Sequence, residues 1–516
     1  MKRIPEPPST SARGFLGLLA SGLAAVLAFA APAADAKRLN IVLIYADDLG
    51  YGDLRSYNPD SRIPTPHLNR LAEEGLRFTD AHSSSGICTP SRYTLLTGRA
   101  HWRDFHFIDR GFDPPFFKPG QLTLPEMLRQ RGYHTACIGK WHLGNDWDSI
   151  RKPGTPPDSR EHGDFDWSQP LRGGANDHGF DYYFGDNVIN FPPYVWIENG
   201  RVLTVPDTTY RGHPENEQPK EGNWECRDGP AMADWDFYQV LPTLGEKAVE
   251  YIHSRRDGAE PFFLYFSLPS PHTPIVPNDE FDGRSEAGPY GDFVVETDAV
   301  CGRLFAALRE AGLYENTIIL FTSDNGAESL AFRRDEKFDH WSSAPLRGVK
   351  RDLYEGGHRV PTVLKWPGVT EAGTVTDALF SQADVMATLA AYLGFPLPED
   401  SAEDSFDFWP YLRGSSSQPP RSTLVYNTFP DRYALRHREW VLIDFPTGAH
   451  RPPPEAWMEK HGVPPYDGLK TGLYNLEEDI GQRHNLAEKH PEIVAELQER
   501  LRHIRAGSHT APRLAK

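Results

Sequence analysis

Two pairs of oxygen-bearing side chains each close an apolar run of the chain. Asp47 and Asp48 end a run near the N-terminus, and Asp324 and Asn325 end a later one. Hard cations such as Ca²⁺ and Mg²⁺ prefer oxygen ligands, while Zn²⁺ usually recruits His or Cys. An Asn carbonyl suits Ca²⁺, so Ca²⁺ is the favoured ion and Mg²⁺ the alternative. Taken alone, Asp47 and Asp48 fit equally well a strand-ending turn whose carboxylates bond to local backbone.

A cysteine and an arginine are spaced by one helical turn in Cys88-Thr89-Pro90-Ser91-Arg92. On a helix that starts near Pro90, the side chains of Cys88 and Arg92 approach each other. The N-terminus of such a helix favours bound anions, because its free N–H groups and its dipole are directed at the ligand. The segment therefore predicts a cysteine beside an anion site. The simpler interpretation is a buried structural cysteine next to a surface arginine.

Four basic side chains complete the set of candidates. Lys140 and His142 alternate along an extended segment, so we expect both to point to the same side of it. His272 lies between prolines, which fix the backbone but do not by themselves imply catalysis. Alone, Lys140 and His142 would be a solvated strand end, and Lys350 would be an ordinary surface lysine.

Continuous apolar runs predict strands that are covered on both faces of a sheet. Strands are predicted at 40–46, 135–141, 262–266 and 317–322, and helices at 65–75, 124–132 and 293–311. This alternation predicts an α/β fold with a large mixed, mostly parallel sheet sandwiched by helices. In such sheets the ligand site lies beyond the carboxyl ends of the strands. The polar groups that follow the four runs are therefore expected at one edge of the sheet.

The chain is predicted to divide into a catalytic domain, 37–415, and a C-terminal α+β domain, 416–516. Within the first, 145–235 is rich in Pro, Gly, Asp and Trp and has little periodicity. Long loops of this kind tend to be functional, so this insertion is predicted to form a wall or lid over the site. Its aromatic residues could stack on sugar or aryl rings, or fill the core of the loop itself. Short strand-like pieces and one amphipathic helix predict a small antiparallel sheet with a helix in the second domain.

Residues 1–36 are predicted to be an export signal. A positively charged leader precedes an apolar run at 15–30, and a small-x-small cleavage site ends at Ala36. The run is short for a bilayer span of roughly 20 residues, which favours a signal peptide over an uncleaved membrane anchor. We expect an exported protein, periplasmic or secreted, with no stable membrane insertion after removal of the signal.

The composition excludes some classes of protein. The 516 residues are 39% apolar and 12% aromatic, which is enough for a packed core. The net charge of -18 argues against a nucleic-acid partner, since phosphate contacts need clustered Lys and Arg. Only four cysteines are present, with no CxxC pair or HExxH motif, so no zinc site is predicted. Cys137 and Cys301 are expected in the core.

These motifs resemble those of type I sulfatases, the formylglycine-dependent branch of the alkaline-phosphatase-like superfamily. The resemblance covers the chain from about Asn40 to Asn485. Its motifs are Cys88-Thr89-Pro90-Ser91-Arg92 with Leu95-Leu96-Thr97-Gly98-Arg99, then Gly139-Lys140-Trp141-His142-Leu143-Gly144, Asp324-Asn325-Gly326, and the segment 346–357. His358 stands where an apolar residue is common in the family, and is interpreted as a local variation rather than a ligand.

The resemblance implies a role for every candidate residue. Cys88 would be oxidised to formylglycine by a maturation enzyme, and the hydrate of that group would be the nucleophile. One Ca²⁺ would be bound by Asp47, Asp48, Asp324, Asn325 and the modified Cys88. Arg92 would stabilise the formylglycine, Lys140 and Lys350 would hold the sulfate oxygens, and His142 and His272 would transfer protons.

The implied activity is hydrolysis of an aryl sulfate or a sulfated carbohydrate through a covalent sulfo-enzyme. One alternative is a phosphomonoester or phosphonate hydrolase of the same superfamily. Phosphatases there commonly use Ser or Thr with two zinc ions, so Cys88 and Asn325 argue against it. The other alternative is a protein that binds sulfated glycans without turnover, which would need Cys88 to stay unmodified.

Overall fold

The computed structural model describes residues 38–212 and 219–514. Leu39–Lys516 forms one compact unit, and the predicted signal at 1–36 lies outside the described residues. The predicted boundary at 415/416 stays a prediction. Within the described residues, no helix combines the length and the apolar character that a bilayer crossing needs.

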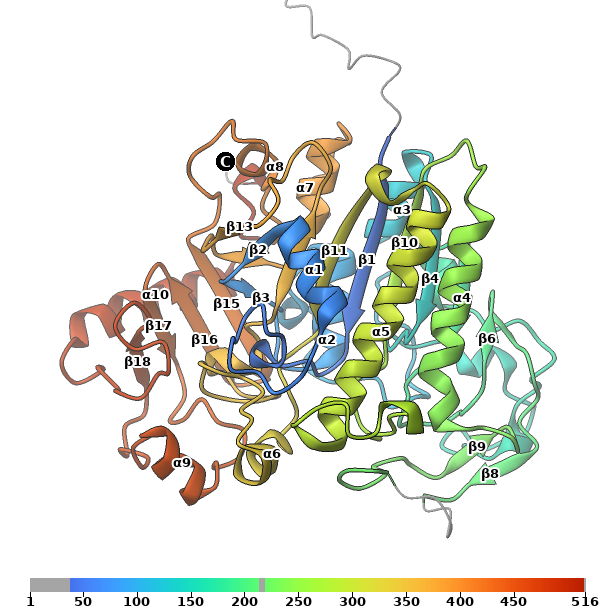
Figure 1. Cartoon of the computed structure of the whole chain (residues 1–516), viewed down its shortest axis with the longest axis horizontal. Coiled ribbons are helices and arrows are strands. Elements are labelled where there is room, and N and C mark those ends of the chain that lie inside the picture. Colours follow the sequence, from blue (N-terminus) through green and yellow to red (C-terminus); the bar gives the residue numbers. More distant parts are fainter. Residues whose placement is uncertain (1–37, 213–218, 515–516) are drawn as a thin grey trace, which may run out of the picture. The chain divides into compact units, whose positions relative to one another are not determined.

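A ten-stranded mixed sheet forms the centre of this unit (Figure 1). In spatial order its strands are β13 (Thr374–Thr376), β2 (Leu76–Phe78), β12 (Thr362–Lys365), β11 (Thr317–Ser323), β1 (Asn40–Ala46), β10 (Phe262–Ser267), β4 (His134–Gly139), β5 (Tyr182–Gly185), β6 (Ile197–Glu198) and β7 (Arg201–Val202). From β11 to β5 each strand is parallel to its neighbour, and antiparallel pairs flank this part. The predicted mostly parallel sheet is confirmed.

The side chains of β1 show why helices cover both faces of the sheet. Successive residues of a strand point to opposite faces. Val42 and Ile44 join one core cluster, which also takes in α1 (Pro66–Glu74), α4 (Val240–Ser254) and α5 (Gly288–Glu310). Ile41 and Leu43 join the other, with α2 (Cys88–Thr97), α3 (Leu124–Gln130) and α7 (Asp384–Tyr392). Burial of one such side chain stabilises the folded state by about 1.5–3 kcal/mol. A strand that is apolar on both faces therefore needs a layer of helices on each face of the sheet.

Two local expectations need correction. The strand predicted at 135–141 ends earlier, at Gly139. The φ of Gly139 is 115°, a value that glycine adopts without strain and other residues rarely adopt. A Cβ there would lie 1.9 Å from the carbonyl oxygen of Ser267, so the ends of β4 and β10 approach closely. Lys140 and His142 therefore lie beyond the strand, and His142 has φ 55° rather than an extended conformation.

Helix α1 begins at Pro66, within the predicted range 65–75, and the hydroxyl of Thr65 before it makes no capping hydrogen bond. The carboxylate of Asp298 in α5 accepts from the backbone N–H groups of His67 and Leu68 at 3.1 and 2.8 Å. The free N–H groups of the first turn are thus satisfied by a neighbouring helix.

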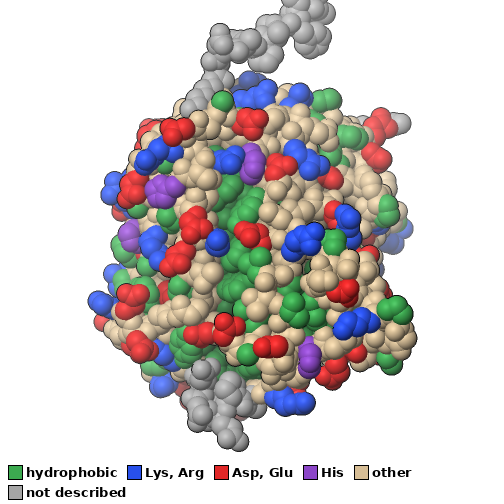
Figure 2. Space-filling model, turned by 90° about the vertical axis from the view of Figure 1, so that its right-hand side faces the viewer, with side chains coloured by type: hydrophobic (Ala, Val, Ile, Leu, Met, Phe, Trp, Pro, Cys, Tyr) green, Lys and Arg blue, Asp and Glu red, His purple; other side chains and the backbone are tan. Residues whose placement is uncertain are grey.

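The insertion 145–235 is partly built into the main sheet. It supplies β5, β6 and β7, and it forms a separate pair of strands, β8 (Thr208–Tyr210) and β9 (Gly229–Ala231). Figure 2 shows the side of the molecule on which β6, β8 and β9 lie, with acidic and basic side chains interspersed around a band of apolar ones. Leu203 and Val205, between β7 and β8, are more than half exposed.

The C-terminal part contains the predicted antiparallel sheet and helix. The sheet has the order β15 (Thr423–Phe429), β16 (Arg432–His437), β17 (Trp440–Ile443) and β18 (Gly472–Asn475). Leu497 and Leu501 of α10 (Pro491–Ala506) are buried against Leu435, Leu442 and Leu473 of this sheet. The remaining elements are β3 (Ala81–His82), β14 (Phe380–Ser381), α6 (Ala331–Phe338), α8 (Trp409–Leu412) and α9 (Glu455–His461).

Candidate active site

The residues proposed from sequence meet at the carboxyl edge of the parallel strands. Asp47 and Asp48 follow β1, Lys140 and His142 follow β4, His272 follows β10, and Asp324 and Asn325 follow β11, while Cys88 opens α2 and Lys350 comes from the loop after α6. All of these side chains are at most 8% exposed. The strand register explains the convergence, because Tyr45 of β1 is paired with both Ser267 of β10 and Thr322 of β11.

Asp47 lies at the centre of the contacts. Its Oδ1 is 3.6 Å from Cys88 Sγ, and its Oδ2 is 2.5 Å from Lys140 Nζ and 3.5 Å from Arg92 Nη2. Burial raises the pKa of Asp47, but the positive charges of Lys140, His272 and Arg92 outweigh it and hold that pKa well below its usual value. Asp47 is therefore an ionised carboxylate beside the sulfur atom.

Asp48 and Asp324 form the other half of the cluster. Lys350 Nζ is 2.8 Å from Asp48 Oδ1, and His272 Nε2 is 3.7 Å from Asp48 Oδ2. Asp324 Oδ2 accepts from Arg92 Nη2 at 2.9 Å. Burial, followed by the negative charge of Asp47, raises the pKa of Asp324 to about 7. Three carboxylates thus share one buried site and repel one another.

The donor set fits a hard cation. Asn325 donates from Nδ2 to Asp48 Oδ1 at 2.6 Å, whereas its buried Oδ1 has no hydrogen-bond partner among the described residues. Ligand atoms of Asp47, Asp48, Cys88 and His272 lie within 4.8 Å of one another. Carboxylate oxygens with an orphaned amide oxygen are typical ligands of Ca²⁺. A cation at this position would also relieve the repulsion between the carboxylates.

Cys88 is the first residue of α2, and it lies one turn before Arg92 as predicted. Burial, together with the charge of Asp324, raises the pKa of the Cys88 thiol to about 12. The thiol is consequently protonated at neutral pH, and a protonated thiol is a weak nucleophile. Arg92 Nη1 donates to the Ser267 hydroxyl, which fixes the guanidinium between the ends of β4 and β10.

His142 has its two ring nitrogens in different environments. Nε2 donates to the backbone carbonyl of Asp109 at 3.0 Å, and Nδ1 is buried without a partner among the described residues. Since a carbonyl only accepts, Nε2 carries the hydrogen and Nδ1 keeps a free lone pair. Burial lowers the pKa of His142, and the charges of Lys140 and Arg92 lower it further. The neutral ring can therefore accept a proton at Nδ1.

Three polar residues at this edge were missed in the sequence. The Asp109 carboxylate accepts from the N–H groups of Gly111 and Gly144 and from Asn187 Nδ2, and so holds the loop that carries His142. Both carboxylate oxygens of buried Asp186 have no partner among the described residues. Asp186 and Asn187 directly follow β5, so the strand-end rule could have found them, whereas Asp109 lies in a loop without a motif.

Two buried features lie apart from this cluster. His358 is packed against His82, with 3.1 Å between their Nδ1 atoms, and its ring stacks on Tyr426 of β15. Ligand atoms of His82, Glu355 and His358 lie within 4.8 Å of one another. The interpretation of His358 as a local variation stays a prediction.

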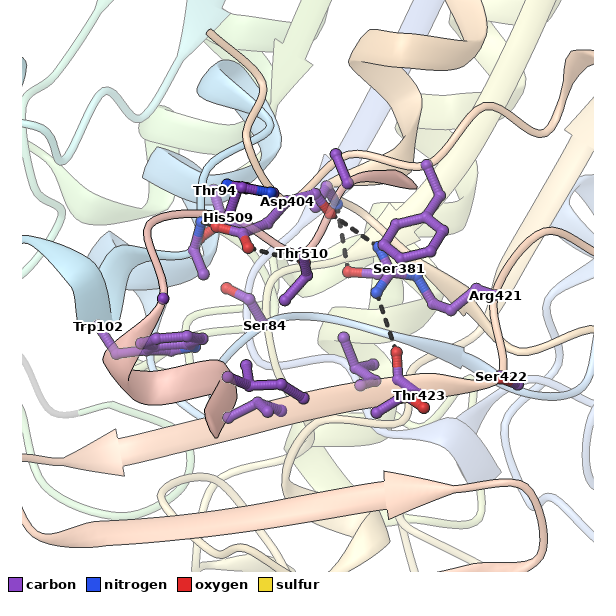
Figure 3. Close-up of a pocket in the computed structure, with 18 of the residues that line it drawn as sticks. Ser84, Thr94, Trp102, Ser381, Asp404, Arg421, Ser422, Thr423, His509 and Thr510 are labelled. Atoms are coloured by element: carbon purple, nitrogen blue, oxygen red, sulfur yellow. Dashed lines mark hydrogen bonds between the residues drawn. The ribbon is translucent and has the colours of Figure 1, made fainter. Parts of the chain in front are cut away.

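A cavity of about 440 Å³ separates the end of α2 from β15 and the end of α10 (Figure 3). None of the ten candidate residues lines it. Two of its charged residues have partners: Arg421 bonds to Asp384, and Asp404 bonds to Arg103 and Thr510. The cavity lies where α2, β14 and the start of α7 meet β15 and α10.

Known proteins resemble this chain over most of its length. Residues 39–395 match the family model described as Sulfatase. An N-acetylgalactosamine-6-O-sulfatase of Bacteroides thetaiotaomicron is 33% identical over 506 residues, which cover 91% of this chain and 94% of the relative. Arylsulfatase A of Homo sapiens is 34% identical over 500 residues, with 92% and 89% covered. A solved structure from work on glycosaminoglycan metabolism by Bacteroides thetaiotaomicron has a TM-score of 0.76 at 30% identity and covers 92% of this chain and 100% of its own.

Proposed function

Because this chain belongs to the sulfatase family, we propose that the cluster around Asp47 is its active site and that formylglycine derived from Cys88 is its nucleophile. The chain is an enzyme, a sulfuric ester hydrolase of the alkaline-phosphatase-like fold, acting on sulfate esters of carbohydrates or aryl groups. The observation that carries the proposal is the position of Cys88, at a helix N-terminus and in contact with Asp47, whose carboxylate also pairs with buried Lys140 and Arg92.

Two groups would complete the site. Formylglycine in its hydrated form supplies a nucleophilic oxygen and a second hydroxyl, which a serine lacks. Ca²⁺, when bound by Asp47, Asp48, Asp324 and Asn325, polarises the sulfuryl oxygens. The orphaned Oδ1 of Asn325 and the mutual repulsion of the carboxylates support this assignment over a purely structural ion-pair network.

The cations of the site are suited to a sulfate ester. Its leaving oxygen gains negative charge in the transition state, and fixed positive charges near the sulfuryl oxygens stabilise that state. Both lysines are buried, Lys140 against Asp47 and Lys350 against Asp48. Their ammonium groups are already held in place, so they need not reorient when negative charge develops on the substrate in the transition state.

The two histidines are suited to proton transfer at opposite ends of the reaction. His272 Nδ1 donates to the carbonyl of Thr273, which leaves Nε2, 3.7 Å from Asp48 Oδ2, as the atom that would first be protonated and then pass that proton to the leaving alcohol. His142 Nδ1 is the free base that would accept the proton of the second hydroxyl. The two roles need two rings, because the alcohol leaves before the sulfate is released.

We propose a sulfated carbohydrate as the physiological substrate, with sulfate at O6 of N-acetylgalactosamine as the first ester to test. The support is the name of the Bacteroides thetaiotaomicron relative, which matches over nearly its whole length. The match to human arylsulfatase A makes 4-nitrophenyl sulfate a suitable general reporter. Export to the periplasm or the medium stays a prediction from residues 1–36.

The decisive experiment is mass spectrometry of the tryptic peptide 78–92 combined with a sulfate-release assay. Protein is produced with and without a formylglycine-generating enzyme, and Cys88→Ala serves as the control. Conversion replaces one sulfur and two hydrogens by one oxygen, so the peptide becomes lighter. We expect activity to rise with the converted fraction and to need Ca²⁺. An unconverted cysteine with full activity would refute formylglycine, and full conversion without sulfate release would refute the assignment of the site.

A further inference from the structure

Lys350 stands at the corner of a tight turn that residues 349–352 form. The Asp352 N–H donates to the Val349 carbonyl at 2.9 Å, and Asp352 Oδ2 accepts from the Val349 N–H at 3.0 Å. Asp352 therefore closes the turn twice, once with its backbone and once with its side chain. Lys350 and Arg351 are the two central residues. The conformation of the turn thus sets the direction in which the Lys350 side chain leaves the backbone.

The backbone of Arg351 makes this turn unfavourable in isolation. Its φ of 76° is typical of the third residue of a type II turn, where glycine or asparagine is usual. Such a conformation persists only where the surrounding structure holds it. The Lys350 N–H donates to the Ala327 carbonyl and the Arg351 N–H to the Gly86 carbonyl, both at 2.8 Å. These bonds tie the turn to the loop after β11 and to the segment that precedes Cys88.

The other tethers of the turn come from the loop 444–451, which follows β17 of the C-terminal sheet. Asp352 Oδ1 accepts from the His450 N–H at 2.6 Å, and the Leu353 N–H donates to the Gly448 carbonyl at 2.7 Å. The two oxygens of one carboxylate thus join the turn to a backbone group that lies 98 residues later in the chain.

Apolar packing reinforces this attachment. Leu353 and Tyr354 directly follow the turn and are buried in one core cluster with residues of the C-terminal sheet, among them Tyr426, Ala434, Val441, Ile443 and Tyr474. A Cβ on Gly448 would lie 2.9 Å from two ring atoms of Tyr354, closer than side chains normally pack. The backbone of the loop therefore approaches the segment after Lys350 as closely as a glycine permits.

An aspartate is suited to bridging the turn and the loop. The Asp352 side chain is buried, and each of its oxygens accepts from a different backbone N–H group. An asparagine could accept from only one of them, because its amide nitrogen only donates. Burial raises the pKa of Asp352 to about 7, and the N–H groups of His450 and Val349 act in the opposite direction. The chain thus keeps a carboxylate in a buried position, where only its hydrogen bonds compensate the loss of solvation.

The residue at the corner has to be placed with care. Lys350 Nζ is 2.8 Å from Asp48 Oδ1, and its side chain is buried. A lysine ammonium sits on a flexible stem of four carbons, so its position depends on how firmly its backbone is held. A displacement of about 1 Å of a group that contacts the reacting atoms can reduce the rate about 10²-fold. A shift of the turn would therefore reach the reaction through Lys350.

We propose that Asp352 is a positioning residue, which makes the placement of Lys350 in the active site depend on the C-terminal sheet. The inference rests on the proposed function, in which Lys350 holds a sulfuryl oxygen. It extends the support of the active site to the loop 444–451. Because Asp352 acts through Lys350, its effect on the reaction should disappear when the lysine is absent.

The test is a double-mutant cycle with matured protein and 4-nitrophenyl sulfate. Asp352→Ala should lower kcat about 10- to 100-fold, and Asp352→Asn, which keeps one acceptor, should lower it less. In a Lys350→Met background, the same substitutions should change kcat by less than about twofold. Effects that multiply in the double variants, or a wild-type kcat in both single variants at Asp352, would overturn the proposal. Asp352→Asn preserves the size of the side chain, so the cycle can be completed if Asp352→Ala does not fold.

Asp298→Ala is the matched control for general destabilisation. Asp298 is also a buried carboxylate whose two oxygens accept from backbone N–H groups, those of His67 and Leu68 at the start of α1. This variant should lower Tm and keep the kcat of the wild type. An equal loss of kcat in Asp298→Ala and Asp352→Ala would show that destabilisation, and not the placement of Lys350, causes the effect.

A second readout does not depend on sulfate release. A buried amine that is paired with a carboxylate reacts slowly with an acylating reagent such as an acetyl N-hydroxysuccinimide ester, and mass spectrometry quantifies the acylation of Lys350. Asp352→Ala should speed this reaction about tenfold, through local opening of the turn, and Asp298→Ala should not. Unchanged acylation in Asp352→Ala would contradict the positioning role. Failure of the proposed function is distinct, because matured wild-type protein would then release no sulfate from 4-nitrophenyl sulfate or N-acetylgalactosamine 6-sulfate, while acylation would still report the placement of Lys350.

Discussion

Replacement of Arg92 tests the electrostatics of the active site most directly. Its fully buried guanidinium bonds to Asp324 Oδ2 at 2.9 Å, lies 3.5 Å from Asp47 Oδ2, and donates to the Ser267 hydroxyl. Arg92→Gln removes the positive charge and keeps a side-chain amide. Arg92→Lys keeps the charge but loses the planar fork that reaches several acceptors at once. The pair of variants separates charge from geometry.

The size of the effect follows from burial. Removing one partner of a buried ion pair costs about 3–5 kcal/mol, because a carboxylate is left without compensation. For the unit Leu39–Lys516, an unfolding entropy of about 2 cal/mol/K per residue amounts to about 1 kcal/mol/K. Arg92→Gln is therefore expected to lower Tm by about 3–5 °C. Arg92→Lys should cost about half as much, since the charge remains and the second contact is lost.

The assay is scanning calorimetry in EGTA and in excess Ca²⁺, with sulfate release measured in parallel. Ca²⁺ bound between Asp47 and Asp324 would replace part of the missing charge, so the loss of Tm in Arg92→Gln should be smaller with the ion. The kcat of this variant should fall about 10²–10³-fold, as when one preorganised contact to the transition state is lost. A Tm equal to that of the wild type in EGTA would refute the claim that the guanidinium holds the buried carboxylates together.

Two further predictions concern conditions rather than the catalytic groups. Removal of Ca²⁺ with EGTA should abolish activity and lower Tm, because an ion present at about 100 times its Kd stabilises the folded state by about 2.7 kcal/mol. A Tm that does not change on EGTA addition, with Mg²⁺ also absent, would contradict the metal assignment. Burial lowers the pKa of His101 to about 3. The unfolded chain then binds more protons than the folded one as pH falls below about 6.5, so stability is full above pH 7 and about 2 kcal/mol is lost by pH 5. Urea midpoints at pH 7 and 5 measure this loss, which should shrink in His101→Gln; an equal loss in both proteins would show that other groups carry the acid sensitivity.

The convergence of the site could be predicted because it depends on a general rule. Apolar runs at 40–46, 262–266 and 317–322 were long enough to be recognised as buried strands, and parallel strands end at one edge. The polar residues at their ends therefore had to be neighbours. Cys88 and Arg92 were linked by helical spacing in the same way.

The orientation of the side chains could not be predicted in this way. Lys140 and His142 were expected to alternate along a strand, but Gly139 ends β4 and His142 takes a positive φ. The close approach of the Ser267 carbonyl demands a glycine at this point, and that carbonyl lies on a strand more than a hundred residues later in the sequence. The tautomer of His142 likewise depends on the carbonyl of Asp109, for which the sequence offers no signal.

The sequence by itself determined the order of the elements, the identity of the candidate residues and the edge at which they meet, because hydrophobic periodicity and turn residues are local properties of the chain. Only the tertiary structure decided the capping of α1 by Asp298 and the partners of each charge, such as Asp324 for Arg92. These depend on contacts between segments that are distant in sequence. Their distances and burial set the electrostatic energies, and local patterns do not encode either quantity.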